Sequence, residues 1–290
     1  MVEISTPAEM RSWSRAEHRR GHEIGFVPTM GALHEGHLRL VDRARARTDR
    51  VVVSIFVNPL QFGPHEDFDR YPREPERDRR LVAERGVDCL FAPAREALYP
   101  TDPLVRVAPG PLGNVLEGAA RPGHFEGVLT VVAKLFHIVE PDIAVFGRKD
   151  LQQSLLVRRM VADLDLGVEI DMAPTVRELD GLALSSRNRY LTADERRAAL
   201  SLSRALRAVE QAWRAGDADR ASLERRGMEA LRSPGVSPEY LTLVGEDLRP
   251  ATRANARSAV VVAAMVGTTR LIDNVVLGEG LANDVSVRAS

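Results

Sequence analysis

The sequence has 290 residues, of which 44% are hydrophobic, 28% charged and 5% aromatic, a composition typical of a globular protein of about two domains. Its 40 basic and 41 acidic residues leave a net charge of −1, which argues against nucleic acid or a membrane surface as partner, because both attract a net basic protein. The single cysteine, the lack of a visible secretory signal and the lack of a long apolar run predict a cytoplasmic protein.

Short apolar strands alternate with helical patterns in the first part of the chain. We expect strands at 24–27, 51–57, 87–92 and 143–146, and helices at 34–47, 77–85, 128–139 and 151–164. An unbroken β-branched run such as 51–57 suits a strand that is buried on both faces. Strand–helix alternation with short connections predicts an α/β fold with a doubly wound parallel sheet.

The pattern changes after Pro174. Helices are expected at 192–214, where Thr192 and Glu195 form a capping box, and at 220–232. Strands are expected at 239–244, 259–266 and 270–273. This α+β pattern predicts a domain boundary near residue 176, with a first domain at 1–176 and a smaller C-terminal domain at 177–290.

A histidine pair stands between the first predicted strand and the first predicted helix. Residues 28–37 read Pro-Thr-Met-Gly-Ala-Leu-His-Glu-Gly-His, and open α/β sheets bind ligands at this end of their strands. His34 and His37 project from one face of the first helical turn, and Gly31 and Gly36 let the backbone approach a ligand. Unpaired N–H groups at a helix N-terminus suit phosphate. His-x-Gly-His is the phosphate-binding signature of nucleotidyltransferases, so we predict a nucleotide site; the alternative is a pair that only caps the helix.

Two neutral amides, Asn58 and Gln61, follow the second predicted strand. Amides can bind a hydroxyl and a carboxylate without adding charge, which favours a substrate site. The alternative is a polar turn in which Asn58-Pro59 simply ends the strand.

A lysine marks the end of the strand predicted at 143–146. Only Lys134 and Lys149 of the 40 basic residues are lysines, and Lys149 lies in Gly-Arg-Lys-Asp-Leu-Gln-Gln at 147–153. Gly147 permits close approach of a ligand, Lys149 can neutralise a phosphate charge, and Asp150 can accept hydrogen bonds from ribose hydroxyls. The alternative for Lys149 is a charge that is only solvated.

A polar loop lies at the predicted domain boundary. Ser185, Ser186 and Arg187 could clamp triphosphate oxygens, or could form a serine-rich linker that caps a helix. There is no phosphate loop of the Gly-x-x-x-x-Gly-Lys type, no Gly-x-Gly-x-x-Gly fingerprint and no Cys/His cluster at zinc spacing.

Six stretches together resemble the pantothenate synthetase, or pantoate–β-alanine ligase, family. They occur in family order over about residues 27–274. They read Pro-Thr-Met-Gly-Ala-Leu-His-Glu-Gly-His, Phe-Val-Asn-Pro-Leu-Gln-Phe-Gly, Arg-Pro-Gly-His-Phe-Glu-Gly-Val, Lys-Asp-Leu-Gln-Gln, Asp-Gly-Leu-Ala-Leu-Ser-Ser-Arg-Asn and Arg-Leu-Ile-Asp-Asn.

The resemblance implies a Rossmann-like fold of the HIGH-motif nucleotidyltransferase type, with a nucleotide- and pantoate-binding domain and a C-terminal lid. It implies that ATP converts pantoate to pantoyl-adenylate with release of pyrophosphate, and that β-alanine then displaces AMP to give pantothenate, for coenzyme A biosynthesis. Mg²⁺ accompanies the triphosphate, and family members are typically homodimers.

The resemblance also implies roles for residues. His37 acts as proton donor in catalysis, together with His34 and Lys149. Gln61 and Gln153 hold pantoate, and Gln61 also lies near β-alanine. Asn58 is added to the substrate-binding residues because it stands near Gln61 after the same predicted strand. The residues expected to bind ATP are Met30, Gly31, Ala32, Leu33, His34, Glu35, Gly36, His37, Gly147, Arg148, Lys149, Asp150, Val176, Leu184, Ser185, Ser186 and Arg187.

Three places depart from the family pattern. Arg148 stands where the family usually has Glu, which reverses a charge beside Lys149. Residues 172–174 read Met-Ala-Pro instead of Gly-Val-Pro, next to the adenine-binding segment. Arg77-Asp78 occupies the place of adjacent acids that are suggested metal contacts in some members, so we predict no protein ligand for a metal.

Two other functions stay open from the residues. A nucleotidyltransferase that adenylates a phosphate would need a basic group where Gln61 and Gln153 offer amides. The second alternative is a nucleotide-binding regulator that has lost catalysis, and Arg148 is the substitution that suggests it. Release of AMP that depends on β-alanine separates all three.

Overall fold

The computed structural model describes residues 1–64, 66–281 and 285–287, which form two compact units. The first unit consists of Met1–Arg148 and Gln152–Ala173, and the second of Lys149–Leu151 and the chain from Pro174 onward. The chain thus passes from one unit to the other at Ala173–Pro174, and a short segment around Lys149 groups with the second unit. In the described part of the chain, no helix combines the length and the apolar character that crossing a bilayer requires.

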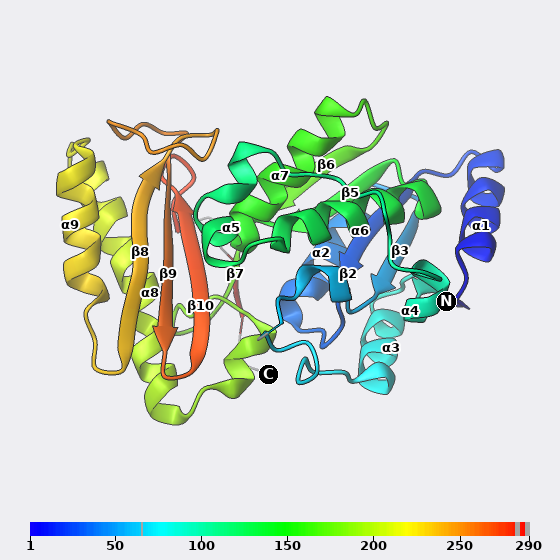
Figure 1. Cartoon of the computed structure of the whole chain (residues 1–290), viewed down its shortest axis with the longest axis horizontal. Helices are drawn as coiled ribbons and strands as arrows, with labels where there is room; N and C mark the ends of the chain where they lie inside the picture. The colour runs from blue at the N-terminus through cyan, green and yellow to red at the C-terminus, as the bar shows by residue number, and fades with distance from the viewer. Residues whose placement is uncertain (65, 282–284, 288–290) are drawn as a thin grey trace. The chain divides into compact units, whose positions relative to one another are not determined.

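A six-stranded parallel sheet forms the centre of the first unit (Figure 1). Its order is β1-β4-β3-β2-β5-β6, and all of its pairings are parallel. The strands are β1 (Val2–Ile4), β2 (Ile24–Thr29), β3 (Arg50–Ile55), β4 (Cys89–Phe91), β5 (Ile143–Gly147) and β6 (Glu169–Ala173). From β2 the chain winds outward through β3 and β4, and β5 then returns to the other side of β2. The winding therefore reverses between β2 and β5, and such a switch point is where open α/β sheets bind ligands.

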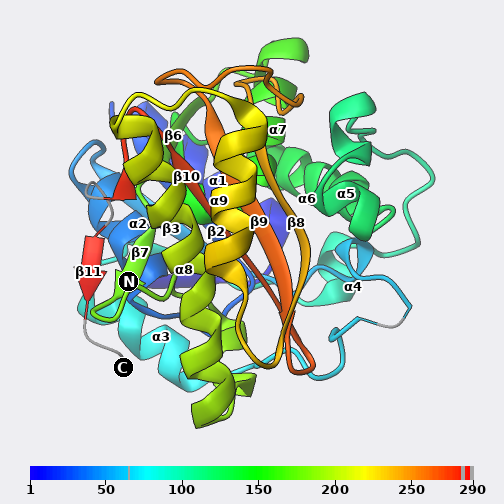
Figure 2. The same cartoon turned by 90° about the vertical axis from the view of Figure 1, so that its left-hand side faces the viewer.

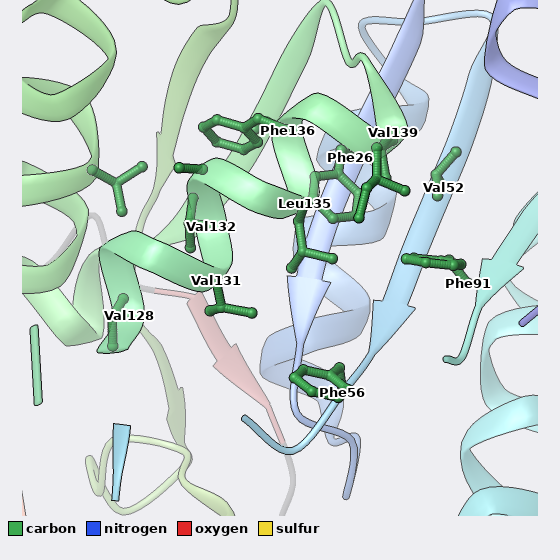
Figure 3. Close-up of a cluster of buried hydrophobic side chains, with 14 of the residues drawn as sticks. Phe26, Val52, Phe56, Phe91, Val128, Val131, Val132, Leu135, Phe136 and Val139 are labelled. Carbon is green, nitrogen blue, oxygen red and sulfur yellow. The ribbon is translucent and has the colours of Figure 1, made fainter. Parts of the chain in front are cut away.

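Both faces of this sheet are buried, because successive strand residues enter different cores. Phe26 and Val52 pack with Phe91 and the apolar face of α6 (Figure 3), whereas Val27 and Val53 pack on the opposite side with α2. The helices of this unit are α1 (Pro7–Arg19), α2 (Glu35–Arg45), α3 (Pro75–Glu84), α4 (Arg95–Leu98), α5 (Glu117–Ala120), α6 (His124–Val139) and α7 (Leu151–Asp163), the last of which begins in the second unit. The predicted doubly wound parallel sheet is confirmed.

The second unit combines helices with an antiparallel sheet. Its sheet has the order β10-β9-β8, and α8 and α9 cover one face of it (Figure 2). The elements are β7 (Val176–Glu178), α8 (Ala193–Arg214), α9 (Arg220–Leu231), β8 (Val236–Val244), β9 (Ala259–Val266), β10 (Thr269–Val276) and β11 (Val285–Val287), with β11 parallel to β7. The predicted capping box is present, since Thr192 N–H donates to Glu195 Oε2 at 2.8 Å and Glu195 N–H to Thr192 Oγ1 at 3.3 Å. This is the smaller α+β domain expected from the sequence.

Element ends differ from the predictions where local contacts outweigh periodicity. The helix expected at 34–47 begins one residue later, because His34 is its N-cap. The helix expected at 128–139 begins at His124, and the strand expected at 239–244 begins at Val236, with a bulge between Pro238 and Tyr240. The strands β1, β6, β7 and β11 and the helix α1 were not predicted; three of these strands have only three residues, too few for a periodic signal.

Candidate active site

The turn after β2 has a left-handed backbone at two consecutive residues. Gly31 has φ +84° and Ala32 has φ +50°, a region that costs a side chain about 1 kcal/mol or more. A Cβ at residue 31 would lie 3.0 Å from both Asp78 Oδ2 and Ile55 Cγ2, so a side chain there would push against both neighbours as well. Gly31 N–H donates to Thr29 Oγ1 at 3.2 Å, which closes the turn onto the strand.

A buried carboxylate holds this turn. Asp78 of α3 is 1% exposed, and its two oxygens accept from Ala32 N–H and Leu33 N–H, both at 2.8 Å. Burial raises the pKa of Asp78, although the two backbone hydrogen bonds act in the opposite direction. The neighbouring Arg77 donates from Nη1 to Leu33 O at 2.8 Å. Two adjacent residues of α3 thus hold both the N–H and the C=O groups of the turn.

The two histidines cap their own helix. His34 Nδ1 accepts from Gly36 N–H at 3.1 Å, and His37 Nδ1 accepts from His34 N–H at 3.3 Å. Their rings lie against each other, with centroids 4.1 Å apart and planes 32° apart. A ring that accepts a hydrogen bond through Nδ1 carries its proton on Nε2. Each ring therefore presents an N–H donor on the side away from the helix backbone.

This arrangement corrects one expectation about phosphate binding. The sequence suggested unpaired backbone N–H groups at this helix start, but the N–H of Gly36 in the first helical turn donates to His34, and those of Ala32 and Leu33 in the preceding turn donate to Asp78. Capping and a phosphate site are therefore not alternatives here. The caps use Nδ1 of each histidine, and the donors suited to phosphate are the Nε2–H groups.

The two amides after β3 form one hydrogen-bonded unit. Asn58 is 1% exposed and donates from Nδ2 to Gln61 Oε1 and to Gly127 O, both at 3.1 Å. Its Oδ1 accepts from Tyr99 Oη–H at 3.2 Å, and burial raises the pKa of Tyr99 to about 12, so the phenol stays a donor. Asn58 thereby fixes the orientation of the Gln61 amide. Gln61 Nε2 is directed at Met30 Sδ, 3.2 Å away, and a thioether is a weak acceptor that a carboxylate or hydroxyl can replace.

The main chain of Gln61 is held from α6. His124 Nδ1–H donates to Gln61 O at 2.9 Å, while its Nε2 accepts from Arg121 Nη1 at 3.0 Å. Burial, and then the neighbouring Arg121 charge, lower the pKa of His124 to about 4, so the ring is neutral. Arg121 also pairs with Glu66, and the resulting hydrogen bond lowers the pKa of Glu66 in spite of its burial. Gly127 lets α6 approach, since a Cβ there would be 2.2 Å from Leu60 O.

The segment after β5 is divided between the units. Gly147 ends β5, opposite Ala173 of β6, and Ser154 Oγ–H donates to its carbonyl oxygen at 3.1 Å. Arg148, the residue that departs from the family pattern, is only 5% exposed, so its guanidinium is not a solvated surface charge. Gln152 donates to Leu112 O and Val115 O, whereas the expected substrate residue Gln153 is half-buried in the first turn of α7.

The second unit contains the remaining expected residues. Lys149 Nζ lies 3.5 Å from Asp150 Oδ1, and its side chain is 21% exposed. Leu184 N–H donates to Val176 O at 2.9 Å, which places these two residues side by side. Ser185 Oγ accepts from Arg187 N–H at 3.3 Å and caps the turn Ser186–Tyr190, the capping role weighed for this loop in the sequence.

The structure thus joins Met30, Asn58, Gln61 and the histidine turn within the first unit, and Lys149, Val176 and Leu184 belong to the second. That all of them surround one nucleotide stays a prediction. Sequence reasoning missed Asp78 and Tyr99 as parts of the site. The signal for Asp78 was a carboxylate four residues before Val82, on the buried face of α3. Among the described residues, no group of three or more His, Cys, Asp or Glu side chains could hold a metal ion.

Comparison with known proteins places this geometry in a wider context. The family model of Pantoate-beta-alanine ligase matches residues 3–276. Pantothenate synthetase of Pelotomaculum thermopropionicum is 49% identical over 281 residues, which are 96% of this chain and 100% of that protein.

Solved structures agree with the sequence comparison. The crystal structure of pantothenate synthetase from Thermus thermophilus has a TM-score of 0.91 and 51% identity, and covers 96% of this chain and 99% of that one. Pantoate-beta-alanine ligase from Francisella tularensis, crystallised with beta-gamma ATP and beta-alanine, has a TM-score of 0.79 and 34% identity over 97% of this chain and 99% of that one.

Proposed function

This chain belongs to the pantoate–β-alanine ligase family and is an ATP-dependent ligase of pantoate and β-alanine, and we propose from that premise how its residues carry the reaction. A carboxylate resists attack by an amine, because its oxygen is a poor leaving group. In the first step a pantoate carboxylate oxygen bonds to the α-phosphorus of ATP, and the bond from that phosphorus to the bridging oxygen breaks to release pyrophosphate. In the second step the amine of β-alanine attacks the carbonyl carbon of the mixed anhydride. AMP leaves with the electron pair, and the nitrogen loses a proton.

The histidine pair supports the first step. The observation that carries this proposal is that Nδ1 of both His34 and His37 accepts a backbone N–H, which fixes each Nε2–H as a donor at the switch point of the sheet. We infer that these donors bind phosphate oxygens and stabilise the charge that develops in the transition state. Protonating Nδ1 of His37 would set two donors against each other at 3.3 Å, so hydrogen-bond donation by the neutral ring is favoured over full proton transfer.

The amide pair supports the binding of pantoate. Gln61 has its oxygen engaged by Asn58, so it offers N–H donors to the pantoate carboxylate or hydroxyl and then to β-alanine. Gln153 is the proposed second pantoate ligand. Asn58 uses both of its amide hydrogens within the protein, which supports an orienting role for it as well as its expected place beside the substrate.

The other proposed ATP ligands lie around Lys149. We propose that Lys149 neutralises a phosphate, that Asp150 binds the ribose, and that Ser186 and Arg187 bind the triphosphate. Mg²⁺ would enter with ATP as part of the substrate, held by phosphate oxygens. A homodimer and a cytoplasmic location complete the proposal; the first is supported by the family resemblance and the second by the single, buried cysteine.

Single-turnover formation of pantoyl-adenylate tests the role of His37. His37→Ala should lower this rate by at least ~10²-fold, the usual scale for loss of a transition-state donor. His18→Ala is the matched control. It also removes an imidazole from the first unit, but this imidazole pairs with Asp142, and both residues are far in sequence from the histidine turn. An H37A enzyme that forms the adenylate at the wild-type rate would remove the basis of this assignment. Release of AMP that depends on β-alanine, measured on the wild type, distinguishes the ligase from a transferase or a regulator.

A further inference from the structure

The stretch Arg-Leu-Ile-Asp-Asn at 270–274 has no part in the reaction as derived so far. It lies on β10, and its last two residues are buried, with Asp273 4% and Asn274 3% exposed. Asn274 N–H donates to Asp273 Oδ1 at 2.8 Å. Two adjacent buried polar residues in a strand are costly unless they are fully hydrogen-bonded, so their partners indicate what they do.

A buried arginine satisfies Asp273. Arg177 of β7 donates from Nη1 to Asp273 Oδ2 at 2.6 Å and from Nη2 to Asp273 Oδ1 at 2.9 Å, and both side chains are at most 5% exposed. The same guanidinium donates to Gly181 O at 3.2 Å and to Asn274 O at 3.4 Å. The fork thereby fixes β10 to β7 and to the turn that leads into the serine loop.

Asn274 extends this cluster to the lysine. Its Nδ2 donates to the main-chain oxygen of Lys149 at 2.8 Å, across 125 residues of sequence. The turn Ser186–Tyr190 also packs against β10. One strand of the second unit therefore contacts two of the segments of that unit to which ATP binding is assigned.

We propose that Asn274 is a positioning residue for Lys149, held in place by the Arg177–Asp273 ion pair; this rests on the proposed role of Lys149 in binding phosphate. The lysine ammonium is a point charge on a flexible stem, so the place of its main chain decides what it can reach. Misplacing a group by about 1 Å can cost ~10² in rate. A hydrogen bond from a rigid strand to the Lys149 carbonyl restrains that main chain.

A double-mutant cycle on the full-length enzyme tests the proposal. The variants are Asn274→Ala, Lys149→Met and the double variant, and the readout is single-turnover adenylate formation at saturating pantoate. We expect N274A to slow adenylation by at least ~10-fold, the effect of about one buried hydrogen bond, and to leave the KM for pantoate within about twofold. In the K149M background the same change should slow the reaction less than about threefold, since Asn274 then has no lysine to position.

The outcomes separate the inference from the proposed function. If N274A slows adenylate formation equally in the wild-type and K149M backgrounds, Asn274 has a general structural role and the proposal is wrong. The proposal is also wrong if N274A has the wild-type rate while K149M is slow. A K149M enzyme of wild-type rate would instead refute the proposed role of Lys149. Ser258→Ala is the control for loss of a buried hydrogen bond in this unit, because Ser258 Oγ accepts a local bond from Asn255 N–H, and the rate of this variant should stay that of the wild type. If N274A does not fold, judged by near-UV circular dichroism, Asn274→Ser takes its place in the cycle.

Discussion

Removing the Asp78 carboxylate tests whether the histidine turn is held from α3. In Asp78→Ala the amides of Ala32 and Leu33 each lose an acceptor at 2.8 Å in a site that is 1% exposed. Hydrogen bonds to charged groups are worth about 1.5–3 kcal/mol each, and partial relaxation of the turn lowers their sum, so we expect a loss of about 3 kcal/mol in the free energy of unfolding. The left-handed φ of Ala32 adds to the preference for another turn conformation.

The same loss should appear in catalysis. If about 3 kcal/mol of preference for the native turn disappears, the fraction of molecules with correctly placed imidazoles can fall by up to ~10²-fold, and the apparent affinity for ATP falls with it. Asp78→Asn keeps one acceptor and turns an NH₂ group toward the other amide, so its effect should be comparable. The matched control is Glu76→Gln on the same helix, whose side chain is 87% exposed and which should change stability by no more than about 0.5 kcal/mol.

Two measurements decide the matter, namely urea unfolding and single-turnover adenylate formation at a temperature where each variant is folded. We expect D78A and D78N to be impaired in both, and E76Q in neither. A folded D78A enzyme with wild-type kinetics for ATP would refute the reasoning, because the turn would then keep its shape without the carboxylate.

Two further predictions concern the support of Gln61. His124 has a pKa of about 4 in the folded protein against an ordinary 6.5, so between these pH values the unfolded chain binds more protons, and acidification should cost up to about 3 kcal/mol of stability. His124→Asn keeps a donor to Gln61 O and should remove this dependence of stability on pH. An unchanged pH dependence in urea unfolding at pH 7, 6 and 5 would contradict the assignment. Gly127→Ala places a Cβ 2.2 Å from Leu60 O, so it should lower the free energy of unfolding by about 1–3 kcal/mol and raise the KM for pantoate. Gly167→Ala, with open space around it, should do neither. Wild-type stability and pantoate KM in G127A would show that the turn tolerates displacement.

The inner strands β2, β3, β4 and β5 of the central sheet were predictable because they lie in apolar runs, whereas the edge strands β1 and β6 were not predicted. Residues such as Val52 and Val53 enter opposite cores, and an unbroken β-branched run is the sequence signature of that burial. The capping box at Thr192 and Glu195 was equally local, since both partners lie within one helical turn. Features that depend on residues within about one helical turn, or on burial of a strand on both faces, could therefore be predicted from the sequence.

The supports that Asp78 and Asn274 give to the site were not predictable, because both depend on residues far apart in the chain. Asp78 meets the amides of Ala32 and Leu33 across about 45 positions, and Asn274 meets Lys149 across 125. Nothing in the neighbourhood of Asp78 distinguishes it from the exposed acids of the same helix except its register with Val82. The sequence therefore predicted candidate ligand-binding groups, but it did not predict the distant groups that hold the site.

The hydrogen bonds of the histidine turn explain why the residues that hold the site matter for function as well as those proposed to bind the ligand. In a phosphate loop the backbone amides themselves contact the ligand, so the loop needs glycine more than it needs partners. Here Asp78 and the two Nδ1 atoms accept from the amides of Ala32, Leu33, His34 and Gly36, and in the proposed function the two Nε2–H groups bind the phosphate instead. Under the proposed function, a turn held in this way needs little rearrangement when ATP binds, which lowers the reorganisation that the transition state would otherwise require. It also makes the rate depend on residues that never touch the substrate, and that dependence is what the Asp78 and Asn274 variants measure.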